Sequence, residues 1–274
     1  MTPGIWTSYF VEFPAEKAIE LLAGKGWRHL ELSDEHGAEL LERGSPERVG
    51  ADIRRFSEDR GVVFPQGHLK LSINIGTEDS DGVIDELRAW LDLFMALGVK
   101  AGVLHPGWRE HAPEDEIMEA RLHVLHALSR HLGDADFTIC LENLQAHNAA
   151  DLLDIIEKAD CPHLGICLDT GHLNQRTPGQ GQADFILAAG RRLKALHLAE
   201  NDGTSDQHLA PFARGSVPWH EVTQALRKIG YTGLFNLEIG GERFAPLPVK
   251  KAKLEYFKTV MEVLLTGDSR RPAL

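Results

Sequence analysis

Several short apolar segments of this chain each end on a side chain that can bind a metal ion, although the segments lie far apart in the sequence. The terminal residues are His68, His105, Glu142, Asp169, His197 and Glu238. Side chains alternate between the two faces of a strand, so strand ends of this kind can converge on one point only if parallel strands close into a barrel. The pattern therefore predicts a (β/α)8 barrel with its active site at the C-terminal rim of the strands.

The rest of the chain is consistent with this architecture. Strand-like segments are expected at residues 4–10, 27–33, 62–68, 101–105, 138–142, 164–169, 193–197 and 234–239, and they alternate with helix-like segments at 14–25, 46–60, 82–97, 113–132, 148–159, 182–191, 218–229 and 248–265. Such alternation is typical of a parallel sheet with right-handed crossovers. The 274 residues are close to the roughly 250 of one TIM barrel. We expect a single domain over residues 1–274, with a tail from about residue 266.

The second strand and two long loops indicate where a site would lie. Leu30 and Leu32 alternate with polar residues, so a barrel would turn the leucines toward the helices and Glu31 into the lumen. The connections at residues 73–80 and 199–217 are too long for plain turns. Long loops of this kind usually lie over the site.

Charge and composition restrict the class of partner and the compartment. The net charge of −12 argues against binding to phosphate backbones and therefore against nucleic acid. No apolar stretch approaches the roughly 20 residues that span a bilayer, and the N-terminus lacks the pattern of a secretory signal. The three cysteines, Cys140, Cys161 and Cys167, have no framework spacing. We therefore expect a cytoplasmic protein, with Cys140 and Cys167 facing inward below the rim.

Four of the strand ends form the central hypothesis for the site: Glu142, Asp169, His197 and Glu238. Three carboxylates and one imidazole favour Mn²⁺, Mg²⁺ or Co²⁺, and also allow Zn²⁺. The alternative is that they are ordinary polar strand ends. Since unpaired buried charges are costly, several converging acids require a cation or basic partners.

Other polar residues are candidates for a second metal or for substrate contacts. His172 follows Asp169 by three residues, and Asp206 and His208 form an Asp-x-His pair in the 199–217 loop. Arg214 in the same loop could bind a phosphate or a hydroxyl group, or could be solvated.

The segments around these residues resemble the xylose isomerase-like TIM-barrel superfamily. This superfamily contains sugar and sugar-phosphate isomerases and epimerases, together with endonuclease IV-type apurinic nucleases. The matching pieces are Leu104-His105-Pro106-Gly107, Leu141-Glu142-Asn143, residues 167–172, Leu196-His197-Leu198, Leu237-Glu238 and the stretch 215–233.

The epimerase branch of the family implies a metal-dependent proton transfer. Residues that match Glu142, Asp169, His197 and Glu238 hold one divalent metal there. One of the two glutamates removes a proton beside a carbonyl, the other returns it, and the metal stabilises the enediolate. His172 would hold a substrate oxygen, and Glu31 matches a lumen acid that would contact substrate. The resemblance implies a small ketose or aldose, with or without a phosphate group, and a homodimer or homotetramer.

The nuclease branch implies three zinc ions, and all nine matching ligand positions are occupied. They are His68, His105, Glu142, Asp169, His172, His197, Asp206, His208 and Glu238. However, Leu71 stands where those enzymes usually carry a tyrosine, and the basic stretch before their Asp-x-His pair is missing. We therefore rank a sugar isomerase or epimerase first and a multi-zinc phosphodiesterase second. A dehydratase or lyase using the same site, and a metal- and sugar-binding barrel without catalysis, stay open.

Overall fold

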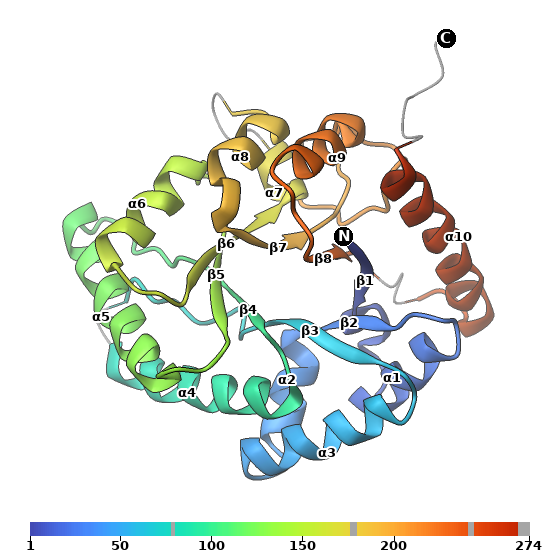
Figure 1. Cartoon of the computed structure of the whole chain (residues 1–274), viewed down its shortest axis with the longest axis horizontal. Coiled ribbons are helices and arrows are strands. Elements are labelled where there is room, and N and C mark those ends of the chain that lie inside the picture. Colours follow the sequence, from blue (N-terminus) through green and yellow to red (C-terminus); the bar gives the residue numbers. More distant parts are fainter. Residues whose placement is uncertain (78–79, 176–179, 241–243, 268–274) are drawn as a thin grey trace.

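A ring of parallel strands surrounded by helices forms the centre of the molecule (Figure 1). The computed structural model describes residues 1–77, 80–175, 180–240 and 244–267. Within these residues, one eight-stranded sheet has the order β7-β6-β5-β4-β3-β2-β1-β8. Its strands are β1 Thr2–Trp6, β2 His29–Leu32, β3 Val63–His68, β4 Ala101–Leu104, β5 Thr138–Glu142, β6 Leu164–Asp169, β7 Leu193–His197 and β8 Leu234–Leu237. The predicted (β/α)8 fold is confirmed.

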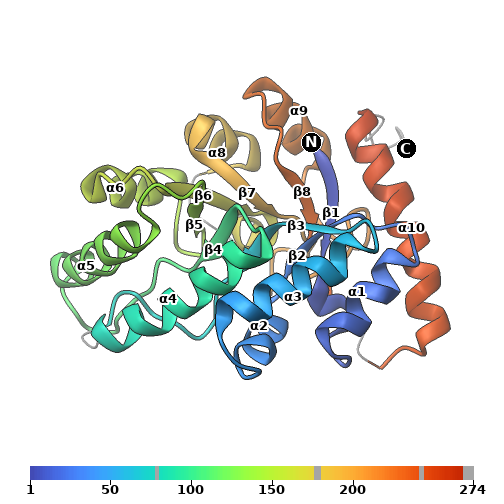
Figure 2. The same ribbon diagram turned by 60° about the horizontal axis from the view of Figure 1, so that its bottom comes forward.

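The helices pack around the outside of the strands (Figures 1 and 2). They are α1 Ala15–Ala23, α2 Asp34–Leu41, α3 Pro46–Glu58, α4 Ser80–Leu97, α5 Glu114–Leu132, α6 Ala149–Ala159, α7 Thr170–Asn174, α8 Gln182–Ala189, α9 Trp219–Lys228 and α10 Leu247–Thr266, with short 3-10 turns η1 Thr7–Phe10 and η2 Gly190–Arg192. The sequence did not predict α2 and α7, which extend the chain between a strand and its following helix. Most of the predicted C-terminal tail, residues 268–274, lies outside the described residues, as do residues 78–79 of the predicted 73–80 loop.

The barrel closes at its rim between β7 and β8. The backbone N–H of Leu198 donates to the carbonyl of Asn236 over 2.9 Å, and the N–H of Glu238 donates to the carbonyl of Leu198 over 3.2 Å. These bonds lie just beyond the end of β7 and at the end of β8. Closure therefore sets His197, the last residue of β7, beside Glu238.

The first strand ends earlier than the sequence pattern predicted. The expected strand at residues 4–10 stops at Trp6, and residues 7–10 form η1. Tyr9 and Phe10 are adjacent, fully buried and packed edge to face. A strand would have pointed one of these two rings into the lumen. A helical turn lets both pack on the outer core, where the Tyr9 hydroxyl donates to the carbonyl of Lys250.

The lumen below the rim is lined by small apolar side chains on one side. Val103, Cys140, Cys167 and Ala195 form a fully buried cluster separate from the main core, each two residues before the rim position of its strand. The cysteines are free, and they face inward as predicted. Burial raises the pKa of the Cys140 thiol to about 12 and so disfavours the thiolate.

The loop at residues 199–217 folds back over the rim. Glu200 and Leu209 pair through two backbone hydrogen bonds of 2.8 and 2.9 Å. The backbone of His208 is left-handed, with φ of +46°. The fold of this loop returns the Asp-x-His pair toward β8. No helix in the described part of the chain is long and apolar enough to cross a bilayer.

One glycine allows helix α4 to pack against the strand that carries His68. A β-carbon built on Gly67 would point away from the lumen and would lie 2.8 Å from the ring of Phe94. We expect Gly67→Ala to lower the free energy of unfolding by about 1–3 kcal/mol because of overpacking. Denaturant unfolding measures this change. In a Phe94→Leu background, which makes room, the same substitution should cost much less. Simple additivity of the two losses would contradict the predicted clash.

Candidate metal and active site

Four side chains from different strands converge at the rim of the barrel. Glu142, Asp169 and His197 end β5, β6 and β7, and Glu238 directly follows β8. Each offers one ligand atom, and these atoms all lie within 4.8 Å of one another. All four side chains are buried. His197 Nδ1 is 2.9 Å from Glu142 Oε1 and 3.3 Å from Glu238 Oε2.

The donor set fits a divalent cation. Asp169 Oδ2 and Glu238 Oε2 are buried and lack hydrogen-bond partners among the described residues. Orphaned carboxylate oxygens at one point are costly unless a cation joins them. A metal with bonds of 2.0–2.2 Å keeps its ligands at most about 4.4 Å apart, close to the observed spread. These four residues could therefore hold one metal ion.

Burial and neighbouring charges shift the pKa values of the two glutamates in opposite directions. For Glu142, burial alone would raise the pKa, but His197, His105 and His68 hold it well below its usual range. For Glu238, burial raises the pKa well above its usual range, and the charges of Glu142 and Asp169 add to that effect. Without a cation, the cluster thus holds more negative charge than its surroundings stabilise.

Glu31 lies beneath this cluster rather than at its surface. It is fully buried, and its Oε1 is 2.8 Å from His197 Nε2. Gln66 Nε2 donates to the same oxygen over 3.1 Å, and the amide of Asn236 donates to Oε2. Both oxygens are engaged, so the geometry does not support the direct substrate contact expected for Glu31.

Two further histidines approach Glu142 from β3 and the end of β4. His68 Nε2 and His105 Nε2 are each 3.2 Å from Glu142 Oε2. The His68 ring also stacks on His197, with 5.3 Å between the ring centroids. The structure thus brings both residues to the cluster, on the side of Glu142 that faces away from His197 Nδ1.

The Asp-x-His pair meets His172 on the other side. Asp206 Oδ2 is 3.2 Å from His172 Nε2 and 3.0 Å from His208 Nε2. His208 Nδ1 lies 2.8 Å from the carbonyl of Glu238, and the His208 ring stacks on Trp6. Burial alone would raise the pKa of Asp206, but both histidines hold it below its usual range.

Arg214 is the one predicted site residue that the structure leaves apart. It is exposed in the 199–217 loop, and within the described residues no hydrogen bond or ion pair joins it to the cluster. Its charge contributes to the lowered pKa of the exposed Asp202, whose main cause is the hydrogen bond from Thr204.

Sequence reasoning missed Trp6, Gln66, Asn143 and Asn236. Gln66 and Asn236 stand two residues before His68 and Glu238, so strand alternation alone would have placed them in the lumen. Asn143 replaces a missing strand bond, because its side chain accepts from the Asp169 N–H over 2.8 Å and donates to the Asp169 carbonyl. No pattern in the sequence indicated Trp6, since β1 was expected to continue past it.

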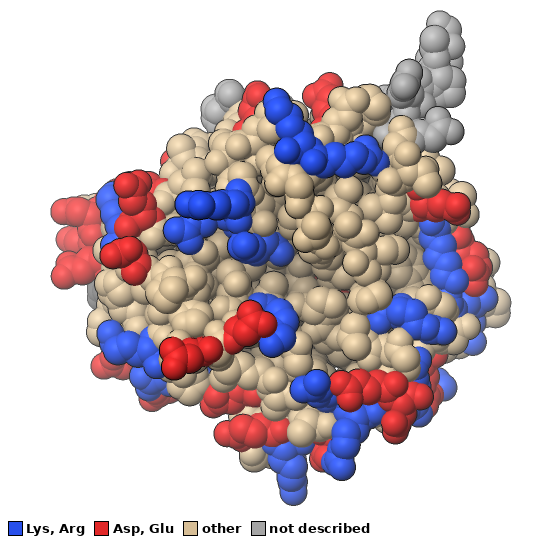
Figure 3. Space-filling model, viewed as in Figure 1, with Lys and Arg blue, Asp and Glu red and all other residues tan. Residues whose placement is uncertain are grey.

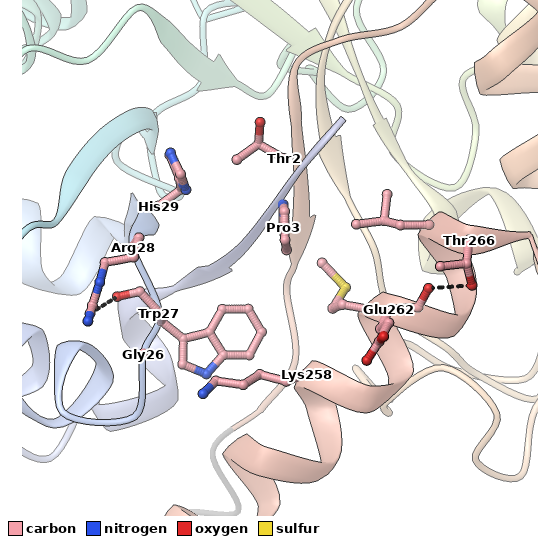
Figure 4. Close-up of a pocket in the computed structure, with 11 residues that line it drawn as sticks. Thr2, Pro3, Gly26, Trp27, Arg28, His29, Lys258, Glu262 and Thr266 are labelled. Carbon is pink, nitrogen blue, oxygen red and sulfur yellow. Dashed lines mark hydrogen bonds between the residues drawn. The ribbon is translucent and has the colours of Figure 1, made fainter.

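A separate cleft of about 540 Å³ lies at the N-terminal ends of the strands, far from the rim (Figure 4). Thr2, Pro3 and residues 26–29 form one wall, and Lys258, Glu262 and Thr266 of α10 form the other. Its lining is mostly apolar. In the described part of the chain, none of its residues belongs to a converging group of metal ligands.

Known proteins resemble the chain along most of its length. Residues 17–260 match the family described as "Xylose isomerase-like TIM barrel". A D-psicose 3-epimerase of Enterocloster bolteae is 26% identical over 252 residues, which are 85% of this chain and 79% of that protein. A D-psicose 3-epimerase of Agrobacterium fabrum is 26% identical over 258 residues, 87% of this chain and 84% of that protein.

Solved structures of sugar epimerases share the fold. A D-psicose 3-epimerase crystallised in the presence of D-fructose has a TM-score of 0.78 and 18% identity, covering 97% of this chain and 99% of that one. An L-ribulose 3-epimerase has a TM-score of 0.78 and 17% identity, covering 100% of both chains. The family resemblance inferred from the motifs is confirmed: the chain belongs to the xylose isomerase-like TIM-barrel family.

Proposed function

We propose that this chain is a divalent-metal-dependent isomerase or epimerase of a small sugar or sugar phosphate. The observation that carries the proposal is the meeting of two glutamates, from β5 and from the end of β8, at one buried ligand cluster. The D-psicose 3-epimerases among its relatives support a ketose as substrate. Glu142, Asp169, His197 and Glu238 would hold the cation.

The two glutamates would carry the proton. One carboxylate removes a proton from the carbon beside the carbonyl; the electron pair of the broken C–H bond forms a carbon–carbon double bond, and the π pair of the carbonyl moves onto its oxygen. The other glutamate then gives a proton to the opposite face of that carbon, which restores the carbonyl and inverts the carbon. Alternatively, it gives the proton to the former carbonyl carbon while the hydroxyl proton of the first carbon passes to the enediolate oxygen, which isomerises the sugar. When bound, a divalent cation supplies positive charge where this oxygen becomes negative. His172 would hold a substrate oxygen.

Access to the cluster would come from the loops after β4 and β7. His105, Asp206 and His208 keep 20%, 30% and 25% of their side chains exposed, whereas the four central residues are almost fully covered. A substrate would thus meet the Asp206 and His208 side before it reached the glutamates. We propose that Asp206 and His208 contact the distal end of the sugar.

A multi-zinc phosphodiesterase is the second candidate. It is favoured by the approach of His68 and His105 to Glu142 and by the position of Asp206 between His172 and His208. The net charge of −12 speaks against a DNA substrate. On the face at the N-terminal ends of the strands, which is opposite the rim, basic side chains lie in several separate groups, with acidic side chains beside some of them (Figure 3).

Catalysis by the glutamates can be tested on a panel of ketohexoses and ketopentoses in deuterated water. We expect the wild-type protein to interconvert at least one sugar pair and to incorporate solvent deuterium at the carbon that is inverted. Glu142→Gln and Glu238→Gln should each reduce turnover at least about 10³-fold. Glu200→Gln is the matched control, because Glu200 is also fully buried but accepts from Val217 N and Trp219 Nε1. Full turnover by both site variants would refute the assigned roles.

Metal content distinguishes the two candidate functions. Elemental mass spectrometry of protein purified without added metal or chelator should find about one divalent ion per chain. Binding should raise the thermal midpoint, since a ligand at a hundred times its Kd stabilises by about 2.7 kcal/mol. Asp169→Asn should abolish the rise. Three zinc ions per chain, with cleavage of an abasic-site duplex, would instead support the phosphodiesterase.

The metal-free protein should be strained by its own carboxylates. The pKa of Glu238 is raised in the folded state above its unfolded value, which is near 4.5. Below about pH 4.5 the carboxyl is neutral in both states and does not destabilise the fold, but folding stability is lost as the pH rises above that value. With chelator present, Glu238→Gln should therefore be more stable than wild type by about 1–3 kcal/mol at pH 8, with little difference at pH 4. Denaturant unfolding across this pH range measures it. A pH-independent difference would contradict the charge argument.

A further inference from the structure

The deepest polar group of the lumen lies directly under His197. Glu31 of β2 is completely buried, with 0% of its surface accessible to solvent. It does not belong to either group of potential metal ligands found in the described residues. Its contacts are the imidazole of His197 and the side-chain amides of Gln66 and Asn236. The function of a carboxylate buried this deeply requires an explanation.

Glu31 and Glu142 contact opposite ring nitrogens of His197. His197 Nε2 lies 2.8 Å from Glu31 Oε1, which also accepts from the Gln66 amide, so a cation bound at Nδ1 would leave the Nε2 N–H to donate to Glu31. The other ring nitrogen, Nδ1, then points at Glu142 and Glu238, at 2.9 and 3.3 Å. A neutral imidazole in this arrangement presents its lone pair to the ligand cluster.

The orientation of Glu31 is in turn held by two amides. Gln66 Nε2 donates both to Glu31 Oε1 and to the carbonyl of Leu196, which lies 3.3 Å away, so two acceptors hold its amide group in place. Asn236 donates to the other oxygen. Within the described residues, Gln66 Oε1 and Asn236 Oδ1 have no hydrogen-bond partner. Both amides are thus oriented so that their N–H groups bond Glu31, although this leaves their own oxygens without hydrogen bonds from the described residues.

The polar side chains of this layer, Glu31, Gln66 and Asn236, lie on β2, β3 and β8. At the same depth, β4 to β7 contribute the apolar cluster of Val103, Cys140, Cys167 and Ala195. A lumen built for stability alone could continue that apolar packing, because replacing buried charged groups by apolar ones is often neutral or stabilising. The polar side chains instead lie next to His197, which is the one imidazole of the four-residue ligand cluster.

We propose that Glu31 is a positioning residue of the metal site. It accepts the Nε2 proton of His197, holds the ring with Nδ1 toward Glu142 and Glu238, and makes that nitrogen a stronger ligand for a divalent cation. The inference rests on the proposed metal-dependent function. It replaces the substrate contact that the family resemblance implied for Glu31.

The test compares Glu31→Gln with wild type in binding of Co²⁺ and Mn²⁺. Glutamine has the same shape and can still accept from His197, and Asn236 can turn its unpartnered Oδ1 toward the new amide. Titration calorimetry should give a Kd about 10- to 100-fold weaker for Glu31→Gln. The visible spectrum of the Co²⁺-loaded variant should change. The metal-free thermal midpoint should be equal to that of wild type or higher.

Glu200→Gln provides the matched control. This substitution neutralises an equally buried acid that bonds Val217 and Trp219, and we expect it to leave the Kd for metal unchanged. If Glu31→Gln lowers the thermal midpoint of the metal-free protein but keeps the wild-type Kd for metal, the role of Glu31 is merely structural. A wild-type Kd with a raised KM for sugar would mean substrate contact. Either result would overturn the proposal.

A measurement on the wild-type protein does not depend on a variant that folds. In the Zn²⁺-loaded protein, nitrogen NMR of the imidazole rings should show His197 protonated at Nε2 and metal-bound at Nδ1. A proton on Nδ1 would exclude the proposed role of Glu31. If the wild-type protein binds no divalent cation, the proposed function itself is wrong. If wild type binds the cation and Glu31→Gln binds it equally well, this inference alone fails.

Discussion

Closure of the parallel sheet between β7 and β8 is the constraint on which the site depends. The two backbone hydrogen bonds of Leu198 join the chain at the rim, just after β7 and at the end of β8. Without this contact, β7 and β8 would be opposite edges of an open sheet, and His197 and Glu238 would lie far apart. With it, ligand atoms from four strands share a space less than 5 Å across. One pair of main-chain contacts therefore turns separate strand ends into a single cluster.

The cluster concentrates negative charge where solvent cannot screen it. Glu142 is stabilised by three histidines, whereas Glu238 and Asp169 each retain a buried oxygen without a hydrogen bond from any residue that the structure describes. Such an arrangement is unfavourable for folding in the absence of a cation. It is favourable for binding one, because the protein has already removed water from the ligand oxygens. In the proposed metal site, folding stability would be exchanged for preorganised affinity.

The rim of the barrel and the layer of side chains below it carry different kinds of chemical groups. The rim carries groups that could touch a cation or a sugar. The layer below carries Glu31, Gln66 and Asn236 on one side and small apolar residues on the other. His197 connects the two levels, since one ring nitrogen faces each. The same fold serves the epimerases of known structure that it resembles, and the fold alone does not fix a substrate.

Strand alternation and the positions of the strand ends were sufficient to predict the barrel, the eight strands and the side chains that meet at the rim. These are periodic features, and each strand shows them locally. The sequence could not show that residues 7–10 leave the strand, because the competition between lumen and outer core for Tyr9 and Phe10 is decided by packing. It also could not show that Glu31 lies beneath His197 while Arg214 stays apart. Depth in the lumen and the path of a long loop depend on contacts between residues far apart in the chain, and only the tertiary structure determines those contacts.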